Sequence, residues 1–178
     1  MAGTDSDPSL SPDGRQVVFV RKTYSPAGFA EPTDLHPMQT EIRIADVAGT
    51  GGSHLVFGRP VVLHNAEYAT FSEPRLAPGN RYVYFLIHYS VVEFGLVRLN
   101  LASGKASMIS GALDWYVVDA GRYSGDLVVQ KRKTYPEGSN ALYWLISPNG
   151  KKLGYVGESR KEVEEFLSNP KRRAKASP

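Results

Sequence analysis

Few residues in this chain of 178 amino acids have the types and spacing that catalysis or metal binding requires. The chain contains no cysteine, which excludes disulfides, thiolate nucleophiles and cysteine-bound zinc. The four histidines lack the paired spacing of a metal site: His36, His54, His64 and His88. The Gly-Gly-Ser-His sequence at 51–54 lacks the spacing of a nucleophile elbow, and Gly104-Lys105 lacks the earlier glycine of a phosphate loop. We therefore expect no catalytic, metal-binding or cofactor-binding residue, with a pair of loop carboxylates as the open alternative.

A second group of residues suits binding. Aromatic side chains and cations gather between the apolar runs, and on loops this combination is typical of a contact surface. The group consists of Lys22, Tyr24, Phe29, His36, His88, Tyr89, Phe94, Arg132, Lys133 and Tyr135. If strands alternate in direction, the loops that carry these residues fall at one end of the fold. The sequence thus predicts a partner-binding surface, with simple packing of the loops as the alternative.

The elements that must position these residues follow a repeat. Six residues recur sixty-six positions later without a gap: Pro8, Leu10, Pro12, Arg15, Val17 and Phe19. The first copy contains the turn Ser11-Pro12-Asp13-Gly14, in which proline presets one φ and Asp-Gly tolerates a tight reversal. Such a spaced recurrence indicates an array of similar structural units.

Apolar runs with a period of two, separated by glycine and proline, predict antiparallel strands in three units, at 8–57, 68–110 and 112–157. The expected strands are 16–22, 41–47, 53–57, 69–76, 82–89, 95–101, 105–109, 114–118, 126–133 and 141–146. Asn149-Gly150 predicts a type I′ hairpin turn, because both central residues of that turn need positive φ.

The end of the chain has a helical pattern. Ser159 and Glu162 have the spacing of a capping box, so we expect a helix over 158–169. Its apolar stripe consists of Val163, Phe166 and Leu167. A helix this short is marginal alone, so we expect the stripe to pack within the chain, with a partner as the alternative. Residues 170–178 are expected to form a disordered basic tail.

The turn Ser11-Pro12-Asp13-Gly14 and the apolar strand at 16–20 resemble the TolB-type β-propeller repeat, a relative of the WD-type blades. The second copy, at 77–80, keeps proline and glycine but lacks the aspartate, and the third unit lacks the motif. The resemblance implies an all-β array of about three four-stranded antiparallel propeller-like blades with one short C-terminal helix. It does not imply an activity, because such propellers serve as scaffolds, receptors and enzyme lids.

Three blades are too few for closure, because closed propellers have about four to eight. Open edges invite pairing with other chains. Three arrangements would satisfy them: the chain is a piece of a larger protein, the C-terminal helix caps one edge, or two copies pair as a homodimer that closes a six-bladed ring.

The net charge of +3 comes from the tail, because Lys171, Arg172, Arg173 and Lys175 leave 17 of the 21 basic residues against 18 acidic ones. A nucleic-acid partner is therefore not expected, although the tail alone suits anionic lipid or nucleic acid as an alternative. No apolar stretch is long enough for a membrane span. Residues 1–7 are not a signal peptide, so we expect a periplasmic or secreted protein whose signal has been removed, or a cytoplasmic one.

These observations favour a non-catalytic protein-interaction module whose partner binds the predicted loop surface. The alternative is an enzyme, or an accessory or lid domain of a hydrolase, since propellers that resemble this one cap certain serine peptidases. No cofactor is expected for either.

Overall fold

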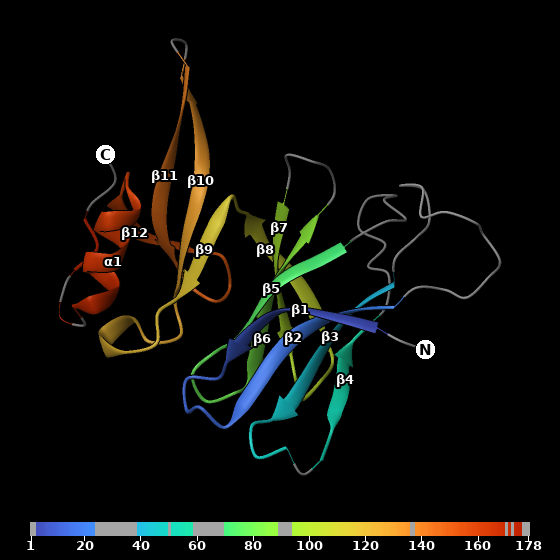
Figure 1. The fold of residues 1–178 in the computed structure, drawn as a ribbon. Coiled ribbons are helices and arrows are strands. Elements are labelled where there is room, and N and C mark those ends of the chain that lie inside the picture. Colours follow the sequence, from blue (N-terminus) through green and yellow to red (C-terminus); the bar gives the residue numbers. More distant parts are fainter. Residues whose placement is uncertain are drawn as a thin grey trace.

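The computed structural model describes residues 3–23, 39–49, 51–58, 70–88, 94–135, 138–169, 171 and 173–175. Within them the chain forms three four-stranded antiparallel sheets, and in each sheet the strands lie in chain order. We call these sheets blades 1, 2 and 3 (Figure 1). They confirm the expected fold class, an all-β array of three propeller-like blades followed by one short helix.

The strands agree closely with the sequence pattern. Blade 1 contains β1 (Gly3–Leu10), β2 (Gln16–Thr23), β3 (Gln39–Asp46) and β4 (Ser53–Phe57). Blade 2 contains β5 (Thr70–Leu76), β6 (Tyr82–His88), β7 (Phe94–Asn100) and β8 (Ala106–Gly111). Blade 3 contains β9 (Asp114–Val117), β10 (Leu127–Tyr135), β11 (Gly138–Ile146) and β12 (Lys152–Gly157). β1 begins before the expected start at residue 8, because its polar residues pair through the backbone without an apolar alternation.

The repeat in the sequence is also a repeat of backbone conformation. Asp7 in β1 and Glu73 in β5 each precede a proline, and their φ angles are 52° and 50°. Both residues lie where the pairing with the next strand shifts, at a bulge. Positive φ is uncommon outside glycine, so the same exception at equivalent positions identifies β1 and β5 as corresponding strands.

The turn at 147–150 differs from the expected type I′ geometry. Gly150 has a φ of +81°, whereas Asn149 keeps a negative φ. The Gly150 backbone N–H donates to the Ser147 carbonyl at 2.8 Å, which makes Pro148 and Asn149 the central residues of the turn. Proline holds φ near about −65°, so a turn with Pro148 in its first central position cannot be type I′.

The core lies between the blades. Val18, Val20 and Ile44 of blade 1 pack against the near face of blade 2. Tyr84 and Leu96, on the opposite face of blade 2, pack against blade 3. Both faces of blade 2 are therefore covered, which explains why β6 reads as a continuous apolar run rather than an alternating one.

Helix α1 (Arg160–Ser168) covers the face of blade 3 that points away from blade 2 (Figure 1). Its predicted capping box is present, with the Ser159 side chain accepting from the Glu162 backbone N–H. Val163 and Phe166 are buried against Tyr143 and other residues of this face. The expected packing within the chain is thus confirmed, and α1 lies where a fourth blade would add.

The expected disordered tail contacts blade 3, where Ala174 packs against the outer apolar cluster and Lys175 is hydrogen-bonded. Lys175 and Tyr155 of β12 exchange two backbone hydrogen bonds, of 2.9 and 2.8 Å. The Lys175 ammonium also lies 3.4 Å from a carboxylate oxygen of Glu162 in α1. This short contact joins the chain after α1 to both the helix and the last strand.

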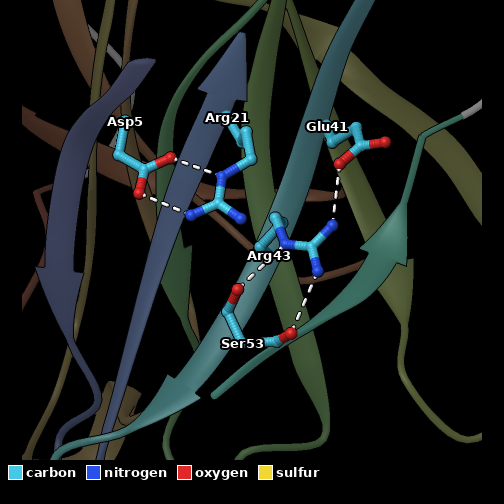
Figure 2. Close-up of polar contacts among 5 residues, drawn as sticks. All are labelled: Asp5, Arg21, Glu41, Arg43 and Ser53. Atoms are coloured by element: carbon cyan, nitrogen blue, oxygen red, sulfur yellow. Dashed lines mark hydrogen bonds and ion pairs between the residues drawn. The ribbon is translucent and has the colours of Figure 1, made fainter. Parts of the chain in front are cut away.

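The corresponding outer face of blade 1 carries paired charges instead of a helix. Figure 2 shows Arg21 of β2 donating from two of its three side-chain nitrogens to the two carboxylate oxygens of Asp5 in β1, at 2.7 Å each. Arg43 of β3 donates to Glu41 at 2.8 Å and to the Ser53 hydroxyl and carbonyl oxygens. The outer faces of the first and last blades therefore differ. Helix α1 covers blade 3, whereas ion pairs within the sheet lie across blade 1.

Candidate functional site

Because neighbouring strands are antiparallel, the connections between them fall at two opposite ends of the strands. The β1–β2, β3–β4 and equivalent turns form one end, which we call the short-turn end. The β2–β3, β6–β7 and β10–β11 connections and the links between blades form the other, which we call the long-loop end. Described members of the predicted binding surface lie at or near the long-loop end: Lys22, His88, Phe94, Arg132 and Lys133.

A cleft of about 460 Å³ lies between blades 2 and 3 at the long-loop end. Its walls include Phe94, Met108, Ala112, Leu113, Lys131 and Arg132. This volume is within the range of about 300–1,000 Å³ that is usual for small-molecule sites. The cleft combines apolar walls with a cationic strand, which suits a partner that has both apolar and acidic groups.

The two-residue link between β8 and β9 sets the width of this cleft. The Ala112 backbone N–H donates to the Phe94 carbonyl at 3.0 Å, on blade 2. The next N–H, of Leu113, donates to the Gln130 carbonyl at 2.9 Å, on blade 3. Successive residues of the link therefore bond to successive blades and hold β7 and β10 on opposite sides of one opening.

His88 supports the aromatic wall. Its ring meets the Phe94 ring edge-to-face, with centroids 4.6 Å apart, and one ring nitrogen hydrogen-bonds the Ser72 hydroxyl. Burial lowers the pKa of His88 below its usual value; Asp7 opposes this shift and Lys22 adds to it. The lowered pKa favours the neutral imidazole, which is held in place by Ser72 and packs on Phe94.

β10 supplies the cations. The Lys131 side chain is half-buried, and burial followed by the neighbouring charge of Lys152 lowers its pKa. Arg132 and Lys133 are exposed. Within the described residues, neither Lys131 nor Arg132 forms an ion pair. A half-buried cation without an anionic partner is a natural contact for an external carboxylate.

The structure thus brings together part of the predicted binding surface. Phe94 and Arg132 line the cleft, His88 packs on Phe94, and Lys22 influences His88 through its charge. Only the backbone of Tyr135 is described, where it pairs with Gly138. The remaining members lie outside the described residues: Tyr24, Phe29, His36 and Tyr89.

Sequence reasoning missed Lys131 and the link at 112–113. The cationic run that follows the apolar part of β10 was a usable signal, since charge at the end of an apolar strand marks its passage into solvent. The role of Ala112 and Leu113 had no such signal, because it depends on backbone hydrogen bonds to two different blades.

A separate group of titratable residues lies on β5 and just after β9. Burial raises the pKa of both Glu73 and Asp119, and the charge of Arg75 partly opposes each shift. The Arg75 guanidinium also lies 5.0 Å from the Trp115 ring centroid, so it joins blade 2 to blade 3. Among the residues that the structure describes, no group of three or more acidic, histidine or cysteine side chains could hold a metal ion.

Comparison with known proteins identifies the fold. No protein-family model matches the chain, and no curated protein matches it. The propeller domain of the trilobed protease from Pyrococcus furiosus, which has an open velcro topology, matches 90% of this chain with a TM-score of 0.55 and 14% identity. TolB from Acinetobacter baumannii matches 88% with a TM-score of 0.51 and 15% identity. Pyrococcus horikoshii acylaminoacyl peptidase matches 89% with a TM-score of 0.57 and 13% identity.

At these identities the likeness shows a β-propeller fold and nothing about activity. The chain spans 44%, 33% and 25% of those three structures, which is less than half of each. A helix capable of crossing a membrane is absent from the described part of the chain.

Proposed function

We propose that this chain is a non-catalytic protein-interaction module whose partner binds at the long-loop end. The observation that carries the proposal is the cleft between blades 2 and 3, which is lined by Phe94 of blade 2 and by Lys131 and Arg132 of β10. Interface cores are enriched in aromatic residues and arginine, and both occur here. Two blades and a hydrogen-bonded link hold the cleft in place, so little ordering entropy is lost when a partner binds.

The distribution of paired and unpaired charges also supports binding at the long-loop end. On the outer face of blade 1 the arginines are matched by carboxylates, whereas Lys131 and Arg132 have no ion pair within the described residues. An arginine that is already paired with a carboxylate gains little from a carboxylate of a binding partner. An unmatched cation that lines a cleft gains when a partner supplies a carboxylate, and Lys131 and Arg132 are the cations that line this one.

Site-specific photo-crosslinking tests this proposal. Benzoylphenylalanine at position 94 should crosslink a protein partner in a saturable manner. The same group at Lys105, an exposed residue at the short-turn end, should not. Equal crosslinking at both positions, or none at position 94, would show that the long-loop end is not the binding surface. Tyr24→Ala and Tyr135→Ala extend the test to the rest of the predicted surface, where each should weaken partner capture.

An accessory domain of a hydrolase is the second candidate. Several of the similar structures are peptidases, and the chain corresponds to about a quarter of the Pyrococcus horikoshii enzyme. A peptidase domain encoded in the same gene would support this candidate. Peptidase or glycosidase activity of the chain itself, in a panel of peptide and glycan substrates, would overturn the non-catalytic assignment.

The homodimer and the compartment remain predictions. The proposed homodimer pairs open blade edges, and its closure into one six-bladed ring would also require displacement of α1 from blade 3. Light scattering over a range of concentrations tests it, and a constant monomer mass would contradict it. A signal sequence in the native gene would support the periplasmic or secreted location over the cytoplasmic alternative.

A further inference from the structure

β10 and β11 continue as a two-stranded ribbon beyond the point where β9 begins. β9 pairs with β10 only over Leu127 to Gln130, whereas β10 pairs with β11 as far as Tyr135. Figure 1 shows this ribbon extending past β9. Within the described residues, β10 therefore has no neighbouring strand on its β9 side after Gln130. An unpaired edge of this kind can accept another strand.

The backbone hydrogen bonds show which groups lie on that edge. The carbonyls of Asp126 and Gln130 accept from Val118 and Leu113, both on the β9 side. In an antiparallel strand, alternate residues direct their N–H and C=O groups to the same edge. The next residue in this series is Arg132, which lines the cleft. Its backbone N–H and C=O therefore face the opening, while those of Lys131 point towards β11.

Successive side chains of a strand point to opposite faces of the sheet, so residues two positions apart share a face. Val129, its cross-strand partner Trp144 and Leu142 all lie in the core between blades 2 and 3. Lys131 pairs with Leu142, so its side chain points to the blade 2 side and into the cleft. Phe94 forms the opposite wall from blade 2. A strand lying along β10 would thus meet a backbone donor and acceptor, one cation and one aromatic ring.

We propose that the cleft binds an extended acidic peptide, which adds to the edge of β10 at Arg132 and places a carboxylate beside Lys131. This inference rests on the function proposed above and names the class of partner for the same site. Strand addition draws affinity from main-chain hydrogen bonds and specificity from alternate side chains. Opposite charges directly across a strand pair are favourable, so the acidic residue stands opposite Lys131. A residue two positions away lies on the same face and reaches Phe94.

A phage-displayed library of random decapeptides, panned against the full chain, provides the probe. Recovered peptides should contain Asp or Glu together with an apolar residue two positions away. Lys131→Glu should weaken a recovered peptide about tenfold or more, because it replaces attraction with repulsion. Lys105→Glu makes the same charge change at the short-turn end and should leave binding unchanged.

Two further changes test the backbone contact. Arg132→Pro removes the Arg132 N–H, which faces the cleft, and it removes no hydrogen bond to β11. Binding should therefore fall while the unfolding temperature stays close to that of the native chain. Arg132→Ala retains the N–H and should bind the peptide far better than Arg132→Pro. N-methylation of alternate residues of the peptide removes donors from one of its edges only, so one of the two methylated series should lose binding and the other should keep it.

Each other outcome overturns the inference. Peptides without acidic residues would contradict the acidic class of the partner. Peptides unaffected by Arg132→Pro and by both methylated series would contradict strand addition. If either kind of peptide still depends on Phe94, the proposed function stands. Recovery of no peptide at all would contradict the inference in the same way, while crosslinking at position 94 would decide the proposed function separately. A dimer that Arg132→Pro converts to a monomer would show that a second copy of the chain occupies the edge.

Discussion

Phe166→Ala tests whether α1 closes the exposed end of the array. Phe166 is 5% exposed and stacks on Tyr123, with ring centroids 5.8 Å apart. Truncation of a buried phenylalanine to alanine costs about 3–5 kcal/mol. In a chain of this length, each kcal/mol lowers the unfolding temperature by about 2–4 °C, so we expect a decrease of roughly 6–20 °C.

In Phe166→Ala, α1 should lose its structure before the rest of the chain unfolds. A nine-residue helix is marginal without its packing partner, so α1 should fray and expose the apolar face of blade 3. That face contains Tyr143, Leu145 and Val156. We therefore expect Phe166→Ala to self-associate at high concentration, because an uncovered sheet face and its edges invite contact with other copies.

Thermal and urea unfolding followed by circular dichroism measure the first effect, and light scattering measures the second. Glu164→Ala is the matched control, because Glu164 is an exposed residue of the same helix. It should change the free energy of unfolding by less than about 0.5 kcal/mol. A Phe166→Ala protein with native stability and a native mass would refute the idea that α1 stabilises blade 3.

Three other predictions follow from single residues. Burial lowers the pKa of His88, so the unfolded chain binds more protons there; stability should fall as pH decreases through about 6.5 towards the lower native pKa, and His88→Gln should remove that decrease in urea titrations. Gly150→Ala should destabilise by more than about 1 kcal/mol in thermal unfolding, because φ is +81° and the new Cβ would lie 2.8 Å from the Ile109 carbonyl oxygen; Gly104→Ala, at φ +65° with open space, should cost less. Lys131→Met should leave stability unchanged or raise it by up to about 1 kcal/mol in urea unfolding, because it removes a half-buried charge, yet it should reduce partner binding.

The candidate site was partly predictable for a clear reason. Phe94 begins β7 and Arg132 lies in the second half of β10, and in a meander the parity of the strands decides at which end each half of a strand lies. Lys131 was not singled out, because only its cross-strand neighbour Leu142 shows that it faces blade 2. The edge of β10 that has no partner strand among the described residues could not be predicted either, since it depends on β9 being shorter than β10.

The turn at 147–150 is a feature that the sequence predicted incorrectly. Asn149-Gly150 favours a type I′ turn when it forms the central pair, but the hydrogen bond from Gly150 to Ser147 moves the pair by one position. Local propensity was correct for Gly150, which needs positive φ, and incorrect for Asn149. Pairing of β11 with β12 determines which residues become central, and that pairing involves contacts across strands.

By itself the sequence determined the repeated hairpin, the number of blades and the capped helix, because periodicity, turn residues and capping boxes act over a few neighbouring residues. Only the tertiary structure decided which face α1 covers, where the two-residue link bonds, and which strand keeps an unpaired edge among the residues that the structure describes. Those features arise from contacts between residues far apart in the chain, whose partners no local pattern specifies.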